Sequence, residues 1–229
     1  MYCYGLVRTR EIETIETMPD GIEGLLRWVI CGEIAALVER DFGMVAGAFS
    51  EAELLTAVVG HDRVLRSVFQ TMTVLPLRFG TEFTTELALQ EHFKQNLSDY
   101  LRKLTALENK AEISLTLTAI APAEVLIPAH LTGRDYFLAR KEQSQQQLQW
   151  QADCDRIRQQ AVDLLAELGV KMRHKNPDSP GDSYVLLYDR SIPVETYCQQ
   201  WRSLVKTQSQ GDWHYVLGEP TPPYHFVGE

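Results

Sequence analysis

The chain has 229 residues, enough for one large or two small hydrophobic cores. Its hydrophobic fraction of 45% and charged fraction of 23% are those of an ordinary globular protein, which excludes a disordered or fibrous chain. The net charge of -9, without any cluster of Lys and Arg, argues against nucleic acid and against an anionic membrane surface as partners.

No stretch has the pattern of a targeting or membrane-spanning segment. The N-terminus opens into strand-like sequence with no basic-then-apolar leader, so we expect no secretory signal. The longest apolar stretch, residues 25–38, is interrupted by Arg27 and Glu33 and is shorter than the roughly 20 residues that a membrane helix needs. The cysteines are widely spaced, with no Cys-x-x-Cys pair, and predict neither a zinc site nor a dithiol redox motif. We therefore expect a soluble intracellular protein with no metal and no cofactor.

Two strand patterns open the chain. Residues 1–7 alternate side chains as a first strand does. Residues 28–39 fit a strand interrupted near Gly32 about as well as a short helix, and we favour the strand.

Two helices are predicted next. Ser50 followed by Glu53 is a capping box, which opens a helix over residues 50–69. Its apolar stripe, expected to face the core, consists of Leu54, Leu55, Val58, Leu65, Val68 and Phe69. A second helix is predicted over residues 84–107, capped by one of its two leading threonines.

The segment between these helices, residues 73–81, is predicted to be a short edge strand. Leu75 and Leu77 alternate with Pro76 and Arg78, so we expect the leucines to face the core. Pro76 has no N–H for a sheet ladder, which favours a sheet edge. Arg78 points the other way and is expected to pair with a carboxylate, either in this chain or on a partner.

From residue 111 the element order becomes strand, helix, strand, strand, helix, strand. The long helix covers about residues 133–168 and contains a Gln-rich part, and a turn-rich connector covers residues 176–182. This order is the split βαβ of a ferredoxin-like fold. We predict an α+β protein of two domains: an N-terminal α+β domain over residues 1–110 and a ferredoxin-like (βαββαβ) domain over residues 111–217 with a long helical insertion.

Residues 218–229 form a Pro-rich tail. The prolines argue against a helix and favour an extended path, on which Tyr224 and Phe226 project to one side as anchors. Such a tail either docks on its own chain or is held out for a partner. We predict docking on the N-terminal domain.

No familiar catalytic motif is present in the sequence. His61, Asp62 and Arg63 resemble an acid–base cluster, but adjacent helical residues point in different directions and cannot converge on one substrate atom. We therefore favour a packed or capping His61 over a catalytic one. We predict no catalytic residue and no enzyme activity.

The run Val74-Leu75-Pro76-Leu77-Arg78-Phe79-Gly80, preceded by Gly60-His61 and Val64-Leu65, resembles the signature of the gas vesicle protein F and L family. The opening residues 2–7 and the closing residues 222–227 agree with this resemblance, which therefore covers essentially the whole chain. One departure is Glu219-Pro220-Thr221, where a Gly-Pro-Trp type of approach to the paired prolines is expected. The departure concerns how tightly the tail packs.

The resemblance implies a minor structural or assembly protein of gas vesicles, the buoyancy organelles walled by a small hydrophobic shell protein. It implies binding to the main shell protein and to other accessory gas vesicle proteins, in the cytoplasm before assembly and in the vesicle wall afterwards. No nucleic acid and no lipid membrane is expected as a partner. The candidate protein-contact residues are Pro76, Arg78, Tyr224 and Phe226.

The alternative is a small-molecule enzyme or ligand-binding protein on a ferredoxin-like scaffold, since a fold does not fix a function. A deep pocket that contains His61 or Arg78 together with convergent polar groups would favour this alternative.

Overall fold

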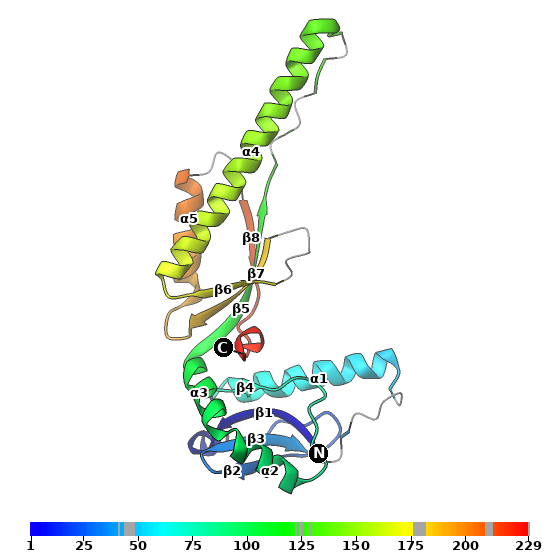
Figure 1. Cartoon of the computed structure of the whole chain (residues 1–229), viewed down its shortest axis with the longest axis vertical. Coiled ribbons are helices and arrows are strands. Elements are labelled where there is room, and N and C mark those ends of the chain that lie inside the picture. The colour runs from blue at the N-terminus through cyan, green and yellow to red at the C-terminus, as the bar shows by residue number, and fades with distance from the viewer. Residues whose placement is uncertain are drawn as a thin grey trace. The chain divides into compact units, whose positions relative to one another are not determined.

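The computed structural model describes residues 1–40, 42–43, 49–121, 123, 126–128, 130–175, 182–208 and 213–228. The chain divides into two compact units: unit 1 comprises Met1–Glu112 and Pro220–Glu229, and unit 2 comprises Ile113–Glu219. Each unit contains a four-stranded antiparallel sheet together with helices, so the α+β class is confirmed (Figure 1).

Unit 1 is built on a sheet of strand order β2-β3-β1-β4. Its strands are β1 (Tyr2–Arg8), β2 (Leu26–Cys31), β3 (Ile34–Glu39) and β4 (Leu75–Pro76). The strand interpretation of residues 28–39 is confirmed, because β2 and β3 form a hairpin. Gly32 lies at its turn with a φ of 70°, a conformation that favours glycine.

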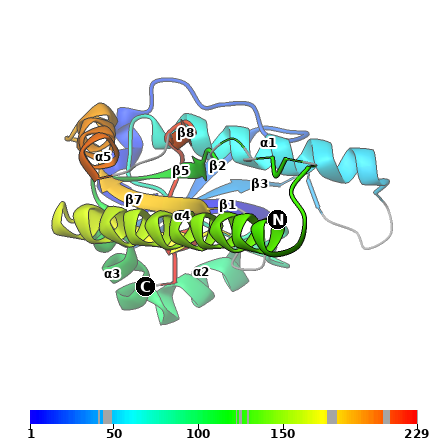
Figure 2. The same ribbon diagram turned by 90° about the horizontal axis from the view of Figure 1, so that it is seen from above.

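Helices cover both faces of this sheet. Helix α1 (Glu51–Phe69) lies on one face, and α2 (Glu86–Gln95) and α3 (Leu97–Leu107) lie on the other (Figure 2). The predicted capping box is present: Ser50 accepts from the Glu53 N–H, and the Glu53 carboxylate accepts from the Ser50 N–H.

The single helix predicted over residues 84–107 is wrong, because α2 ends at Asn96. The φ of -111° and ψ of 16° at Asn96 are not helical, and its side-chain amide donates to the His92 carbonyl at 2.8 Å. Asparagine competes in this way with the helical ladder of the backbone. A 3₁₀ turn, η1 (Thr9–Thr14), follows β1 in the chain.

The predicted core-facing stripe of α1 is correct only in its C-terminal half. The buried residues of α1 are Ala57, His61, Val64, Leu65, Val68 and Phe69. Leu54, Leu55 and Val58 are exposed instead. The reason is length: α1 has 19 residues, about 28 Å, whereas β1 has 7 residues, about 23 Å, and the N-terminal end of α1 extends past the sheet (Figure 1).

The predicted strand over residues 73–81 is much shorter, since β4 contains only two residues. Leu75 pairs with Leu6 and Pro76 with Gly5, at the sheet edge that the proline predicts. Pro76 was expected to face away from the core, yet it is buried. It lies beside the C-terminal tail, which covers this edge.

Unit 2 contains a sheet of order β6-β7-β5-β8. Its elements are β5 (Lys110–Ala119), α4 (Gly133–Glu167), β6 (Lys171–His174), β7 (Asp182–Asp189), α5 (Val194–Gln208) and β8 (Trp213–Leu217). The predicted connector at residues 176–182 lies outside the described residues except for Asp182, the first residue of β7. Helix α4 ends at Glu167, close to the predicted end at residue 168. Gly169 follows with a φ of 73°: the Gly169 N–H donates to the Ala166 carbonyl and the Val170 N–H to the Leu165 carbonyl.

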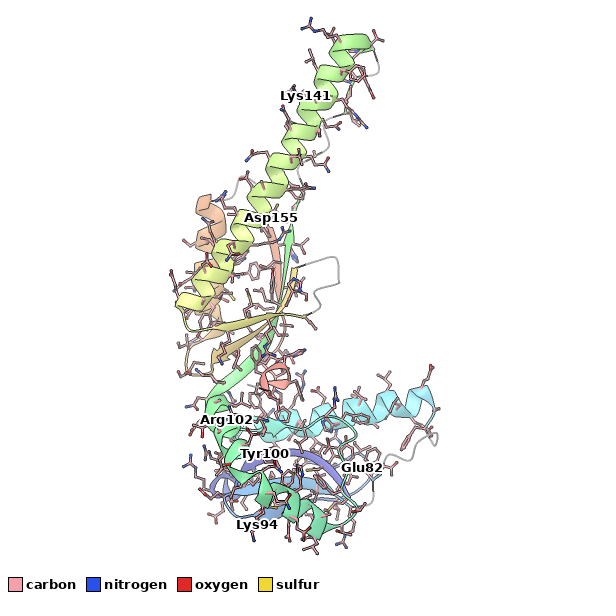
Figure 3. All side chains as sticks on the ribbon, in the orientation of Figure 1. Glu82, Lys94, Tyr100, Arg102, Lys141 and Asp155 are labelled. Carbon is pink, nitrogen blue, oxygen red and sulfur yellow. The ribbon has the colours of Figure 1, made fainter. Side chains whose placement is uncertain are left out.

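The N-terminal part of α4 carries no buried side chain among its described residues. The buried residues of this helix begin at Cys154. Side chains, including Lys141, project from this part of the helix on several sides (Figure 3). None of the helices in the described ranges combines the length and the apolar character that crossing a membrane requires.

A buried carboxylate fixes the turn that precedes β2. Glu39 is fully buried and accepts hydrogen bonds from the Tyr4 hydroxyl and the backbone N–H groups of Ile22, Glu23 and Gly24. The Ile22 and Glu23 bonds measure 2.9 and 2.8 Å. Burial and the adjacent Glu39 raise the pKa of Tyr4. Charge-assisted bonds from these donors satisfy the buried carboxylate without a cation.

We expect Glu39→Gln to lower the free energy of unfolding by about 3 kcal/mol. The amide NH₂ of glutamine would face a group that now donates a hydrogen bond to the Glu39 carboxylate, and two donors cannot bond to each other. Urea titration of the two proteins measures this. Glu91→Gln, on the exposed side of α2, is the control and should leave the midpoint unchanged. Equal midpoints for Glu39→Gln and the control would contradict the role assigned to Glu39.

Candidate functional site

A groove of about 630 Å³ on unit 1 is the candidate site. Its walls are α1, the residues around β4 and the C-terminal tail. The lining residues are Val58, Val59, His61, Asp62, Pro76, Leu77, Arg78, Phe79, Tyr224 and Val227. The groove therefore brings together three of the predicted contact residues, Pro76, Arg78 and Tyr224.

One wall of the groove is aliphatic and continues along α1. Val58 and Val59 line the groove, and Leu54 and Leu55 lie one helical turn before them. All four side chains are exposed, by 40 to 65% of their surface. We call Leu54, Leu55, Val58 and Val59 the aliphatic row. A cluster of exposed large aliphatic side chains is typical of a protein contact surface.

His61 is a packed residue on the inner side of the groove. It is 5% exposed, and its ring stacks on Tyr4. The Tyr2 hydroxyl lies 2.7 Å from Nδ1 of His61 and also accepts from the Gly80 N–H. Nε2 has no hydrogen-bond partner among the described residues.

Burial lowers the pKa of His61 to about 4, against smaller raising effects of the Leu77 carbonyl and the Asp62 carboxylate. The Leu77 carbonyl is thus close enough to act on the ring electrostatically, although Nε2 does not meet hydrogen-bond geometry with it. His61 is neutral at pH 7.

The C-terminal tail forms the second wall, and its predicted extended path is wrong at one turn. Residues Tyr224–Phe226 form a 3₁₀ turn, η2, in which the Phe226 N–H bonds to the Pro223 carbonyl. The turn sends Phe226, 2% exposed, into the core of unit 1. The Tyr224 hydroxyl points to Asp62 Oδ1 at 2.6 Å.

Asp62 is engaged on both oxygens. Arg66 Nε lies 2.6 Å from Oδ2, and Tyr224 donates to Oδ1. Burial first, and then the bond to Asp62, raise the pKa of Tyr224. The carboxylate is therefore used to fix the tail.

Glu112 holds the tail at a second point. This acidic side chain is buried, at 4% exposure. Its Oε1 accepts from Nδ1 of His225 at 2.6 Å and its Oε2 from the His225 N–H at 2.8 Å. Its backbone forms a two-way bridge with Thr221. Nothing local in the sequence signals these contacts, because the partner lies over a hundred residues away.

Arg78 is exposed at the groove. Within the described part of the chain, its guanidinium makes no ion pair, so the internal salt bridge that the sequence left open is not found there. The aliphatic row was missed as an exposed surface. The doublets Leu54-Leu55 and Val58-Val59 were its signal, since their apolar arc is wider than one buried stripe.

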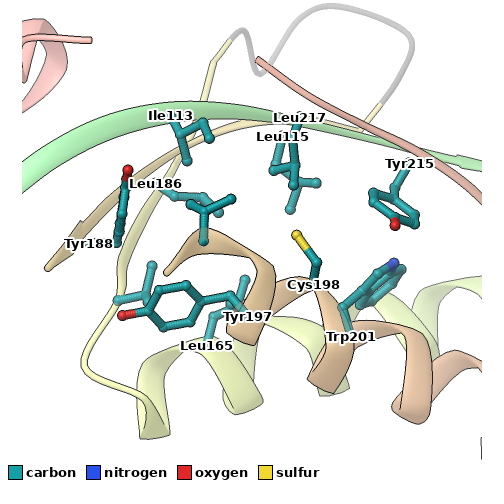
Figure 4. Close-up of a pocket in the computed structure, with 12 residues that line it drawn as sticks. Ile113, Leu115, Leu165, Leu186, Tyr188, Tyr197, Cys198, Trp201, Tyr215 and Leu217 are labelled. Carbon is teal, nitrogen blue, oxygen red and sulfur yellow. The ribbon is translucent and has the colours of Figure 1, made fainter. Parts of the chain in front are cut away.

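A second cavity, in unit 2, is a packing gap. It measures about 30 Å³ and lies among side chains of the sheet, α4 and α5, including Leu115, Leu165, Cys198 and Trp201 (Figure 4). That is space for about one water molecule, and apolar surroundings offer such a water few partners. The described residues also contain no group of three His, Cys, Asp or Glu side chains placed to hold a metal.

Comparison with known proteins points to one family. The model of the family "Gas vesicle synthesis protein GvpL/GvpF" matches residues 1–228. The crystal structure of the gas vesicle protein GvpF from Anabaena sp. PCC7120 is similar with a TM-score of 0.68 at 19% identity, covering 99% of this chain and 94% of that one. GvpF from Microcystis aeruginosa gives 0.63 at 17%, covering 99% and 98%. No curated protein matches the chain.

The low pKa of His61 predicts a pH dependence of stability. Between pH 6.5 and 4 the unfolded chain takes up a proton on this residue that the folded chain does not, so the free energy of unfolding falls with pH by up to about 3 kcal/mol. Replacement by Gln should flatten this part of the curve, measured by urea titration at several pH values. His214→Gln, at an exposed position in unit 2, controls for the loss of a histidine. Parallel curves for wild type and His61→Gln would contradict the assignment.

Tyr224→Phe should lower the free energy of unfolding of unit 1 by about 1 to 2 kcal/mol, because Asp62 loses a charge-assisted hydrogen bond. Hydrogen exchange of the tail amides, read by mass spectrometry, should become faster in the same variant. Tyr136→Phe, where the hydroxyl-bearing ring is exposed on α4, serves as the control. Unchanged exchange in Tyr224→Phe would mean that Asp62 does not hold the tail.

Proposed function

Because the chain belongs to the gas vesicle synthesis protein GvpL/GvpF family, we propose that it is an accessory protein that binds the main shell protein of the gas vesicle, and other accessory gas vesicle proteins, while the vesicle forms. The observation that carries this proposal is the family match over residues 1–228, which includes both units. In this proposal the protein acts in the cytoplasm before assembly and stays in the wall as a minor component.

The chemistry of the groove supports binding rather than catalysis. Nδ1 of His61 and both oxygens of Asp62 are occupied by neighbours: Tyr2 bonds to His61, and Arg66 and Tyr224 bond to Asp62. They do not converge on a point where a substrate atom would react. We therefore propose that the protein is not an enzyme.

The proposed protein-contact residues take two roles. Arg78 and Tyr224 line the groove and would touch a partner directly, whereas Pro76, which also lines it, is buried and would shape the groove. Phe226 is buried, so it would act by anchoring the tail that carries Tyr224. A contact surface with an apolar centre and charged groups around it is typical of protein interfaces.

The domain organisation is part of the same proposal. The element order β5-α4-β6-β7-α5-β8 and the strand order β6-β7-β5-β8 support a ferredoxin-like classification of unit 2, with α4 as its elongated helix. We propose domains over residues 1–110 and 111–217, with the tail, residues 218–229, docked on the first.

One observation favours the alternative, a small-molecule site in the same groove. Nε2 of His61 is buried and has no hydrogen-bond partner among the described residues. Native mass spectrometry of the purified full chain would show a bound compound as a fixed added mass that is reduced in His61→Gln. Detection of such a compound would favour the small-molecule site over the proposed protein-binding role.

Deletion of the gene in a vesicle-forming host is the test of the proposed function. We expect the deletion strain to form few or no vesicles, measured as the loss of pressure-sensitive turbidity, and an affinity-tagged chain to restore them. The tagged chain should also co-purify the shell protein from lysates of the restored strain. Normal vesicles in the deletion strain, together with no co-purified shell protein, would overturn the proposal.

A further inference from the structure

The groove and the aliphatic row form one apolar surface on unit 1. Val58 and Val59 belong to both, so the surface runs without interruption from Leu54 along α1 into the groove. On the opposite side Pro76, Leu77 and Phe79 add apolar area, and Tyr224 and Val227 close the end. We call this surface the docking groove.

The sheet edge at the docking groove does not favour an added strand. The Leu77 N–H is already bonded to the Tyr4 carbonyl at 2.9 Å. Pro76, the β4 residue beside the groove, has no N–H to offer a new neighbour. Proline on an edge strand blocks pairing with another chain. A partner therefore makes contact through side chains, as an amphipathic helix in a groove does.

The length of the apolar surface fits a short helix. The stretch of α1 from Leu54 to Asp62, which carries the aliphatic row and borders the groove, rises by about 12 Å, which corresponds to about eight residues of a helix packed alongside it. Apolar residues of the partner at positions i, i+3, i+4 and i+7 would cover the aliphatic row.

The charges select an acidic partner helix. Arg78 lies at the groove without an ion pair among the described residues. The acidic side chain that lines the groove, Asp62, is already paired with Arg66 and bonded by Tyr224. A carboxylate at the edge of the partner's apolar face would pair with the guanidinium through a bidentate fork.

We propose that the docking groove binds an amphipathic α-helix of another gas vesicle protein, whose apolar face covers the aliphatic row and whose Asp or Glu pairs with Arg78. The proposal rests on the proposed function, since it names the kind of segment that one of the partners offers. It assigns this contact to unit 1 and leaves contacts of unit 2 independent of it.

Photo-crosslinking in vesicle-forming cells tests the occupant. Val59, 59% exposed, is replaced by p-benzoylphenylalanine in the full-length chain, and Leu87, 64% exposed on the opposite face of unit 1, is replaced likewise as the matched control. We expect the first variant alone to join to a segment of a different gas vesicle protein that has apolar i, i+3, i+4, i+7 spacing and an acidic residue. Joining to a second copy of this chain, or to nothing beyond the level at Leu87, would overturn the proposal.

Charge reversal tests the ion pair. Arg78→Glu should weaken binding of the cross-linked segment, made as a labelled peptide, about tenfold in fluorescence anisotropy. Replacing the acidic residue of the peptide by Lys should restore the affinity for Arg78→Glu and lower it for wild type. Lys141→Glu, on α4 of unit 2, is the control and should bind as wild type does. Equal binding by all variants would exclude Arg78 as the specificity residue.

The two proposals fail in different ways. If the chain co-purifies the shell protein and restores vesicles while Val59 and Arg78 variants behave as wild type, the docking groove is wrong and the proposed function stands. If the chain binds no gas vesicle protein at all, both are wrong.

Discussion

Two carboxylates, Asp62 and Glu112, hold the C-terminal tail on unit 1, and the candidate site depends on them. Asp62 accepts from the Tyr224 hydroxyl, and Glu112 binds His225 through both its oxygens. Phe226, which is buried, adds an apolar anchor for the same tail. Because Tyr224 and Val227 form one wall of the groove, the site exists only while the tail is docked.

The surface around the groove combines exposed apolar area with a sheet edge that is blocked against pairing. The aliphatic row leaves apolar area exposed, and exposed apolar patches are typical of surfaces that contact other proteins. Pro76 at the neighbouring sheet edge limits pairing of strands, which is the common route to unselective aggregation. The side-chain contacts that remain possible depend on shape and charge, and both allow selection among partners.

Local signals in the sequence predicted the local structure well. The Ser50–Glu53 capping box, the hairpin turn at Gly32 and the end of α4 just before Gly169 each depend on residues within a few positions of one another. What the sequence did not predict depends on distant parts of the chain or on lengths. The exposure of the aliphatic row follows from α1 being longer than the strands it covers, and the burial of Glu112 follows from a histidine over a hundred residues later. The candidate contact residues could be named from the sequence, but only the fold shows that three of them, Pro76, Arg78 and Tyr224, line one groove.

The position of the tail in the chain sets a time order for the protein's own synthesis. A ribosome must translate the polypeptide through Val227 before the second wall of the groove can be put in place. Until then the growing chain exposes its aliphatic row beside an incomplete groove. Under the proposed binding role, only a chain that has been translated through Val227 presents the complete groove to a partner.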